Sequence, residues 1–404
     1  MYLILSWRNI WRNKKRTVIV AASVFFAVVL SAIMRSGQLG SYEYMIESTT
    51  KMFTGYLQIQ DHDYWDKRSL DNSFLMEDSF LENVKDKRHI TYVTPRLEAF
   101  ALISSDTVTR VTQVVGIHPE YEDELTQISS HLKQGVFLNQ TSQGILIGAS
   151  LAAFLKVSIG DTLALYGMGY HGTTAAALLP VEGILKLPFK SMDNAMTFIA
   201  LPKAQEIFSC KKRITSLPVM IDNIANISKV RNALQAELDS TQVIMSWNEM
   251  MPDLEQSIEV DNIGGIISLG VLYIVIAFGI FGTVMMMVSE RAREFAVLIA
   301  VGMRKNRLII VTALESVILS FLGVITGIIA SIPIVQYLVY HPIYMGDEYA
   351  EMYESFGIEP IMKFSAQPWI FTSQALTVLI IALITIIYPV LFIRKMNIAK
   401  QIRG

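Results

Sequence analysis

Four long apolar runs constrain the fold of this chain more than any other feature of its sequence. A helix needs about 20 consecutive apolar residues to cross the hydrocarbon core of a bilayer. The runs lie at residues 17–37, 262–288, 308–339 and 369–393. No small-residue cleavage pattern follows the first run, so we expect it to remain as a span rather than to be removed as a signal peptide. The sequence therefore predicts four transmembrane helices.

The composition supports a membrane protein and excludes several classes of function. Hydrophobic residues make up 52% of the 404-residue chain and charged residues only 17%, whereas soluble proteins carry about 25% charged residues. A net charge of -2 argues against nucleic-acid binding. The single cysteine, Cys210, excludes an internal disulfide and any cysteine-based metal cluster. The six histidines show no metal-ligand spacing, so no bound cofactor or metal is expected.

A polar region at 38–261 separates the first two spans and is predicted to form an α+β domain with its own core. Alternating or β-branched runs predict strands, and apolar residues at helical spacing predict helices. The predicted strands are 56–60, 108–117, 145–147, 162–166, 181–185 and 197–200, and the predicted helices are 150–155, 202–208 and 227–238. Residues 254–262 contain no helix breaker, so the second span is expected to be the end of a longer helix that stiffly joins this domain to the charged segment after it.

The charged segment 289–307 lies between the second and third spans and is predicted to be a short helix at the membrane surface. Acids open it and bases close it, the order that a helix dipole favours. It also carries an apolar stripe and a glycine at which it could end. These residues are Glu290, Glu294, Phe295, Leu298, Ile299, Gly302, Arg304, Lys305 and Arg307. A basic loop that only orients the protein is the simpler alternative, but such a loop needs neither the acids nor the stripe.

The N-terminal segment 1–16 is predicted to be an amphipathic helix in the headgroup plane. Trp7 and Trp11 suit that depth, and Lys14, Lys15 and Arg16 suit an anionic leaflet of membrane lipids. Basic residues also crowd the segment 289–307 and the tail 394–404. The loop 340–368 is acidic instead, with Asp347, Glu348, Glu351, Glu354 and Glu359. The positive-inside rule then predicts that both termini and the charged segment are cytoplasmic, and that 38–261 is outside.

The chain lacks the motifs of the common catalytic sites. It contains no Walker A pattern, no GxSxG and no HExxH. Within the spans Glu315 is the main ionisable residue, close enough to the surface to be hydrated or to pair with an arginine of a neighbouring helix. Gly323 and Gly327 form a GxxxG pattern that would let another helix approach closely, including one from a second chain. We therefore expect a device that transmits motion, with energy supplied by a separate cytoplasmic protein.

Several stretches resemble the FtsX-like permease subunits of ABC transporters. The stretches are ERAREFAVLIAVGMRKNRL from Glu290, WRNIWRNKKRT near the N-terminus, and YPVLFIRKMNIAKQIRG at the end. In the polar region, GILIGASLAAFLKVSIGDTLALYG, PVEGILK and FIALPKAQEIF are similar to the lipoprotein-releasing permeases within the MacB-like superfamily. The resemblance covers almost the whole chain.

The resemblance implies a non-catalytic permease of a bacterial inner membrane with a MacB-like periplasmic core domain. ATP and magnesium would bind to partner ATPase subunits, and a second permease chain, identical or related, would complete the transporter. Lipoproteins or other amphiphiles would be the substrate. The residues implied to couple to the ATPase are Glu290, Arg291, Arg293, Glu294, Phe295, Leu298, Gly302 and Met303. Some relatives capture a periplasmic carrier with a proline-flanked hook, but here 167–179 is glycine-rich and only Pro180 flanks it.

Two other functions remain open from the sequence. A permease-like chain could pass a signal to a periplasmic protein without moving cargo, or the polar region could be a membrane-anchored binding domain without energy input. If there is a substrate site, we expect it at the outer ends of the first two spans, where apolar surface meets the outside domain. The residues expected there are Met34, Leu39, Ile258, Asn262 and Ile266.

Overall fold

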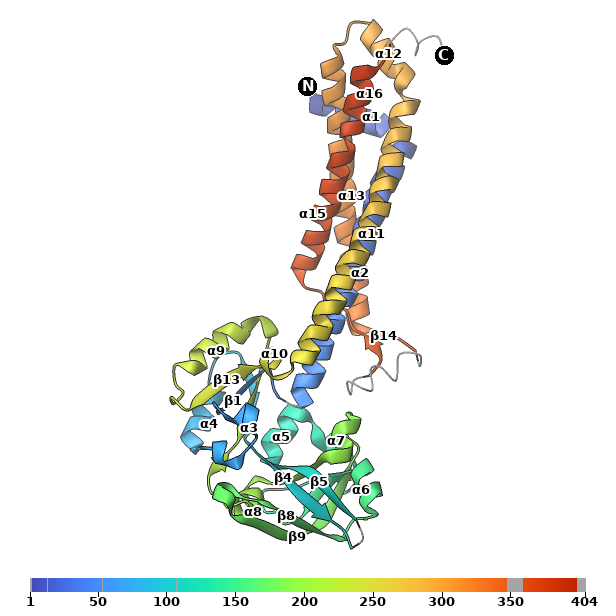
Figure 1. Cartoon of the computed structure of the whole chain (residues 1–404). Coiled ribbons are helices and arrows are strands. Elements are labelled where there is room, and N and C mark those ends of the chain that lie inside the picture. Colours follow the sequence, from blue (N-terminus) through green and yellow to red (C-terminus); the bar gives the residue numbers. More distant parts are fainter. Residues whose placement is uncertain (1, 13, 53, 107, 347–358, 398–404) are drawn as a thin grey trace. The chain divides into compact units, whose positions relative to one another are not determined.

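The computed structural model describes residues 2–12, 14–52, 54–106, 108–346 and 359–397 (Figure 1). The chain divides into two compact units. We call the first, which comprises Met1–Glu43, Ser257–Tyr344 and Ile361–Gly404, the helical unit, and the second, Tyr44–Gln256 with Met345–Pro360, the β-rich unit. Several predicted charges lie outside the described residues, and so does the side chain of Arg16. These charges are Asp347, Glu348, Glu351, Glu354, Lys400 and Arg403.

The helical unit is built from long apolar helices and a short hairpin. Its elements are α1 (Tyr2–Arg12), α2 (Lys14–Met52), α11 (Pro252–Glu290), α12 (Ala292–Ala300), α13 (Lys305–Tyr340), β14 (Ile343–Tyr344), β15 (Ile361–Met362), α15 (Pro368–Thr385) and α16 (Ile387–Lys395). Four helical stretches among the described residues are long and apolar enough to cross a membrane, and each contains one predicted span. The first helix runs to Met52, well beyond the predicted end at residue 37.

The two glycines of the GxxxG pattern pack inside this chain, against α2. A Cβ added at Gly323 would lie 2.7 Å from the Cβ of Val24, and one at Gly327 would lie 2.8 Å from the Cβ of Val28. The predicted close approach is therefore confirmed, and the approaching helix is the chain's own first span. Because only glycine leaves room there, α2 and α13 can bring their backbones together.

The β-rich unit has a mixed sheet with short helices around it. Its strands are β1 (Leu57–Asp61), β2 (Phe74–Leu75), β3 (Ile90–Val93), β4 (Arg96–Ser104), β5 (Thr109–Ile117), β6 (Leu132–Gly135), β7 (Ile145–Gly148), β8 (Thr162–Met168), β9 (Thr174–Leu185), β10 (Met196–Ala200), β11 (Arg213–Ile214), β12 (Ser216–Ile221) and β13 (Gln242–Ser246). Its main helices are α3 (Tyr64–Lys67), α4 (Asp78–Lys85), α5 (Pro119–Thr126), α6 (Ala149–Leu155), α7 (Lys190–Ala195), α8 (Leu201–Ile207), α9 (Ile227–Gln235) and α10 (Trp247–Met250).

Strand pairing divides the sheet into two lobes joined at β4. In one lobe β1 lies between β12 and β13, and β3 also pairs with β12. In the other, β4, β5, β10, β7, β9 and β8 pair in a closed circuit, and β6 joins β9. A single pair, Ser216 with Arg96, connects β12 to β4. The residues around this pair therefore decide how the two lobes are held together.

All six predicted strands and all three predicted helices of this unit correspond to observed elements. The elements that were not predicted are the strands β2, β3, β4, β6, β11, β12 and β13 and the helices α3, α4, α5, α7 and α10. The inward residues of β4 are apolar, yet its outward residues Phe100 and Leu102 are apolar too, so the strand shows no alternation. Strand β12 is buried along its whole length and contains Pro218, which sequence rules disfavour within a strand. The predicted strand at 181–185 is only the end of β9, which begins at Thr174.

Candidate functional site

The charged segment between α11 and α13 contains a helix, α12, that is shorter than predicted. Arg291 leaves helical geometry after α11, and Gly302, with φ +108°, follows the C-terminal end of α12. Only glycine adopts such a φ without strain, so the predicted stop at Gly302 is confirmed. Arg304 caps the next helix, and Lys305 and Arg307 lie in its first turn. The prediction that these three bases end one continuous helix over 289–307 is wrong.

The apolar residues of α12 divide between an inner and an outer face. Phe295 is fully buried, together with Ala292 and Ala296, in the core of the helical unit. Leu298 on the predicted stripe is 41% exposed instead, and Val301 just beyond the helix is 83% exposed. The predicted stripe of Phe295, Leu298 and Ile299 therefore does not face one way. Its first residue fixes α12 to the spans, and the outer face leaves apolar surface available to a partner.

A buried ion pair connects the break before α12 to the third span. Arg291 donates from one terminal nitrogen to Glu315, and their side chains are only 8% and 3% exposed. The guanidinium also lies over the ring of Phe295, 5.0 Å from its centroid. The Nε of Arg291 is buried without a hydrogen-bond partner, and its contact with Glu294 is a loose ion pair of 3.5 Å. Of the two alternatives for Glu315, pairing with an arginine is the one observed.

Helix α1 packs against the third span beside this segment. The hydroxyl of Ser6 donates to the carbonyl of Val311 at 3.1 Å, and Ile10 is buried among residues of α2, α11 and α13. Trp7 and Trp11 are exposed, as an interfacial helix requires. The predicted basic cluster begins α2 rather than ending α1, and the side chains of Lys14 and Lys15 are exposed.

The predicted substrate residues lie along α2 and α11, where the structure adds a polar contact that sequence analysis missed. Arg35 donates to Asn262 at 2.9 Å and to Gln38 at 2.6 Å. Gln38 lies directly over Gly265, so a side chain there would collide with it. Met34 and Ile266 are exposed, Leu39 and Ile258 are partly buried, and only Asn262 takes part in the contact.

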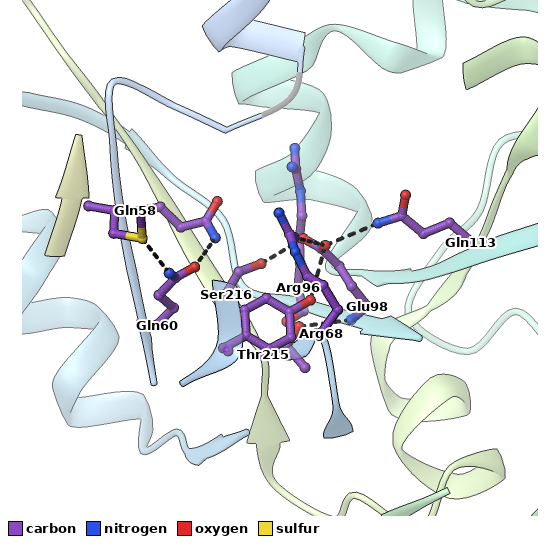
Figure 2. A network of polar contacts seen from close by, with 10 residues as sticks. Gln58, Gln60, Arg68, Arg96, Glu98, Gln113, Thr215 and Ser216 are labelled. Carbon is purple, nitrogen blue, oxygen red and sulfur yellow. Dashed lines mark hydrogen bonds and ion pairs between the residues drawn. The ribbon is translucent and has the colours of Figure 1, made fainter. Parts of the chain in front are cut away.

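A polar network around Glu98 joins the two lobes of the β-rich unit (Figure 2). The carboxylate accepts hydrogen bonds from Ser216 at 2.8 Å, Gln113 at 3.1 Å and the hydroxyl of Tyr64 at 3.2 Å. Arg68 pairs with it at 3.6 Å. Since Tyr64, Arg68 and Ser216 belong to the first lobe, Glu98 on β4 fastens the second lobe to it. No sequence motif marks this network, because its members are spread from 64 to 216.

A second buried ion pair lies beside this network. Arg96 donates to Glu122 from Nε at 2.9 Å and from a terminal nitrogen at 2.6 Å. The hydroxyl of Thr94 donates to the same carboxylate at 3.1 Å. Both charged side chains are buried. This bidentate pair connects α5 to the start of β4, and it fixes the orientation of the two side chains as well as their distance.

The outer side of strands β4, β5, β8 and β9 exposes an unusual number of large apolar residues. Register places Val111, Leu102 and Tyr166 in one row across three strands. The exposed apolar residues of this face are Phe100, Leu102, Val111, Tyr166, Met168 and Leu178, and a groove of about 400 Å³ runs along it. Contiguous apolar surface on a water-facing domain is characteristic of an interaction site.

The turn between β8 and β9 is tied back to the domain and does not project as a hook. The backbone N–H of Tyr170 donates to the carbonyl of Phe208 at 2.9 Å, and that of His171 to Asp71 at 2.7 Å. Arg213 lies over the ring of Tyr170 at 4.7 Å. Among the described residues, no cluster of side chains has the composition of a metal site.

Comparison with known proteins identifies the class to which this arrangement belongs. The model of the FtsX-like permease C-terminal region matches residues 266–398, and that of the MacB-like periplasmic core domain matches residues 17–237. The second match alone covers more than half of the chain. The chain therefore belongs to the FtsX-like permeases that carry a MacB-like periplasmic core domain.

Individual relatives are distant. The lipoprotein-releasing system transmembrane protein LolC of Xylella fastidiosa is 20% identical over 246 residues, 59% of each chain. The macrolide export ATP-binding/permease protein MacB of Psychrobacter arcticus is 20% identical over 328 residues, which cover 78% of this chain and 49% of that protein. The chain thus spans about three fifths of the length of the first LolC relatives that it matches.

Among solved structures, the periplasmic region of MacB from Actinobacillus actinomycetemcomitans is similar with 16% identity and a TM-score of 0.36, covering 52% of this chain and 94% of that one.

The family assignment itself establishes an ABC transporter permease, a multi-pass membrane protein with an extracytoplasmic domain. The LolC and LolE relatives are by name transmembrane proteins of a lipoprotein-releasing system, and the MacB relative is by name an ATP-binding/permease protein.

Proposed function

We propose that this chain converts ATP hydrolysis by a cytoplasmic ATPase into movement of its extracytoplasmic domain, and that α12 is the element on which the ATPase docks. ATP and magnesium would be bound by the partner, and a second permease chain would complete the transporter. Both termini and α12 would be cytoplasmic, in an inner membrane. The basic residues Arg293, Arg304 and Lys395, all at this end of the spans, support that orientation.

The observation that carries this proposal is the attachment of α12. Its inner residue Phe295 is buried among the spans, and Arg291 pairs with Glu315 of α13. Its outer residues Leu298 and Val301 remain exposed. A force applied to the outer face would therefore reach α13 through the ion pair and α11 through the covalent connection. Helix α11 continues without interruption for 39 residues, from Pro252 to Glu290.

We propose a lipid-like amphiphile, such as a lipoprotein, as the cargo. The LolC and LolE relatives belong by name to a lipoprotein-releasing system. The exposed apolar face with Phe100, Tyr166 and Met168 offers an uncharged surface of the kind that an acyl chain or apolar protein segment would contact. The tied-back turn at Tyr170 gives no support to capture of a carrier by a projecting hook.

The test is stimulation of ATPase turnover in the reconstituted complex. Replacing Leu298 and Val301 by serine removes apolar contact from the outer face of α12 without touching the core. We expect the stimulation of ATPase turnover to fall by a factor of about ten or more. Two apolar side chains buried at an interface contribute well over 1.4 kcal/mol to the free energy of docking, which corresponds to about tenfold in affinity. The matched control is Ile310→Ser, an exposed residue on α13. Undiminished stimulation in the double variant would exclude docking at this face.

A separate measurement addresses the cargo. A photoreactive side chain at Met168 or Leu178, both exposed on the apolar face, should crosslink to an acylated molecule in membranes of the expressing cell. Crosslinks only to a non-acylated protein would instead favour the alternative in which the chain signals to a periplasmic partner.

A further inference from the structure

A groove between α1 and α12 combines arginines with apolar residues. It has a volume of about 940 Å³ and is lined by α1, by the segment around α12 and by the start of α13. Its charged lining is Arg8, Arg12, Glu290, Arg291, Arg293 and Glu294, and its apolar lining is Val297, Leu298, Met303, Leu308 and Val311. Four arginines face two glutamates, so the groove carries an excess of positive charge.

The ion pairs within the groove use only some of these arginines. Arg12 pairs with Glu294 at 3.6 Å, and Arg291 pairs with Glu294 and Glu315. Arg8 and Arg293 form no ion pair with any residue that the structure describes. They come from two different helices, α1 and α12, and both line the groove. Two guanidinium groups without a carboxylate partner are suited to hold one phosphate, whose oxygens accept paired hydrogen bonds from arginine.

The rest of the groove decides which phosphate compound fits. Leu308 and Val311 of α13 lie beside the arginines, so the site is amphipathic rather than a simple anion cradle. The exposed rings of Trp7 and Trp11 on α1 are typical of the headgroup depth of a bilayer. We propose that the groove binds an anionic phospholipid of the adjoining leaflet, with its phosphate between Arg8 and Arg293 and its acyl chain along Leu308 and Val311 of α13.

Such a lipid would connect α1 to the charged segment that contains α12. Helix α1 is itself fixed to α13 by Ser6 and Ile10, so one bound lipid would contact all three helices. The charge of the surrounding membrane would then adjust how firmly α12 is held. This inference goes beyond the proposed function, because it concerns lipid binding by the permease alone and does not require an ATPase or a cargo.

Tryptophan quenching by brominated lipids tests the site directly. The full chain, with Trp65, Trp247 and Trp369 replaced by phenylalanine, would emit only from Trp7 and Trp11 beside the groove. It is reconstituted in phosphatidylcholine nanodiscs containing equal fractions of either brominated phosphatidylglycerol or brominated phosphatidylcholine. We expect phosphatidylglycerol to be preferred by about fivefold for each contacting arginine.

The preference should disappear in the variant Arg8→Gln/Arg293→Gln. It should persist in the control Arg394→Gln/Lys395→Gln, which removes the same charge from exposed residues at the end of α16. Equal quenching by both lipids in the parent protein, or an equal loss in the control, would overturn the proposal. Displacement of the lipid by inorganic phosphate would indicate a simple anion site. Displacement by a hexaglutamate peptide would indicate a surface for an acidic protein, and either result would also overturn it.

Discussion

Among the residues that the structure describes, each unit of this permease contains one buried arginine–glutamate pair, and the hydrogen bonds of the two pairs differ. In the β-rich unit, Arg96 donates hydrogen bonds to Glu122 from two nitrogens, and the hydroxyl of Thr94 donates to the same carboxylate. In the helical unit, Arg291 reaches Glu315 with one nitrogen and leaves its Nε without a hydrogen bond. Both pairs are shielded from water, so their geometry rather than their exposure distinguishes them.

We infer from this difference that the Arg96–Glu122 pair is a fixed joint in the β-rich unit and that the Arg291–Glu315 pair is a movable joint in the helical unit. Three donors converge on Glu122, so a shift of any one element would leave a buried charge poorly paired. Arg291 instead lies at a break between helices and has Glu294 as a nearby second partner. An arginine with two acids in reach can change partner while staying paired. Under the proposed function, the element that transmits motion needs such freedom, and a domain that moves as one body does not.

The largest expected effect is on the fixed joint. Arg96→Ala leaves Glu122 buried without its partner, which should destabilise the β-rich unit by about 3–5 kcal/mol. Calorimetry of the full chain should show one unfolding transition shifted to lower temperature. The control is Arg231→Ala, which breaks the exposed pair with Glu249 and should cost less than about 1 kcal/mol. Similar shifts in both variants would mean that Arg96 and Glu122 do not form a fixed joint.

The movable joint should respond to exchange of its charges. Arg291→Glu or Glu315→Arg alone places two like charges together in a buried site, and we expect stimulation of the ATPase to fall about tenfold or more. The double exchange restores opposite charges and should recover a substantial part of the lost stimulation. No recovery, in a double variant that still inserts into the membrane, would show that the pair itself does not transmit the motion.

Gly302 offers a smaller perturbation at the other end of α12. Its φ of +108° disfavours any side chain, although nothing lies within 4 Å of an added Cβ. Gly302→Ala should therefore cost about 1–2 kcal/mol through the backbone alone and reduce ATPase stimulation several-fold. Gly282→Ala in α11 is the matched control, because its surroundings are equally open and its backbone is helical. If both variants behave alike, the turn at Gly302 has no part in coupling.

The smallest effect concerns pH and a third buried acid, Asp193, which forms a 3.7 Å ion pair with Lys186. Burial alone would raise its pKa, but hydrogen bonds from Ser150 and from the N–H of Leu187, with Lys186 nearby, outweigh burial and lower the pKa. An acid with a lowered pKa stabilises the fold above its ordinary pKa of 3.8 and loses that contribution as pH falls through the lowered value. The melting temperature should therefore fall below pH 4 less steeply in Asp193→Asn than in the parent. Equal slopes would contradict this assignment.

Sequence-based prediction was correct for helices and strands that show a single periodicity along the chain. Each of the four spans is an uninterrupted apolar run, and strands such as β7 and β10 are short β-branched runs between turn residues. The predicted stop at Gly302 was right, but the predicted bounds of 289–307 were too wide, because charge order placed Arg304, Lys305 and Arg307 in the same helix whereas α13 begins at Lys305. Prediction failed for β4, whose outward apolar residues hide the alternation of a strand.

Some residues of the candidate site could also be predicted from local pattern, and the contacts between them could not. Glu290, Gly302 and Glu315 could be singled out from local pattern, but the pairing of Glu315 with Arg291 depends on how α13 folds back beside α12. The network around Glu98 and the groove with Arg8 and Arg293 were not anticipated at all. Their members are separated by dozens to hundreds of residues, and no local rule relates them.

By itself the sequence determined the four membrane spans, the position of the inserted domain and the location of the charged segment between the second and third spans, because hydropathy and backbone preferences act over neighbouring residues. Only the tertiary structure decided which charges are paired. It placed Gly323 against α2, buried Arg96 with Glu122, and brought Arg8 and Arg293 to one groove without an ion pair to any residue that the structure describes. Those outcomes depend on distances between elements remote in the chain, where burial and electrostatics act through space rather than along the backbone.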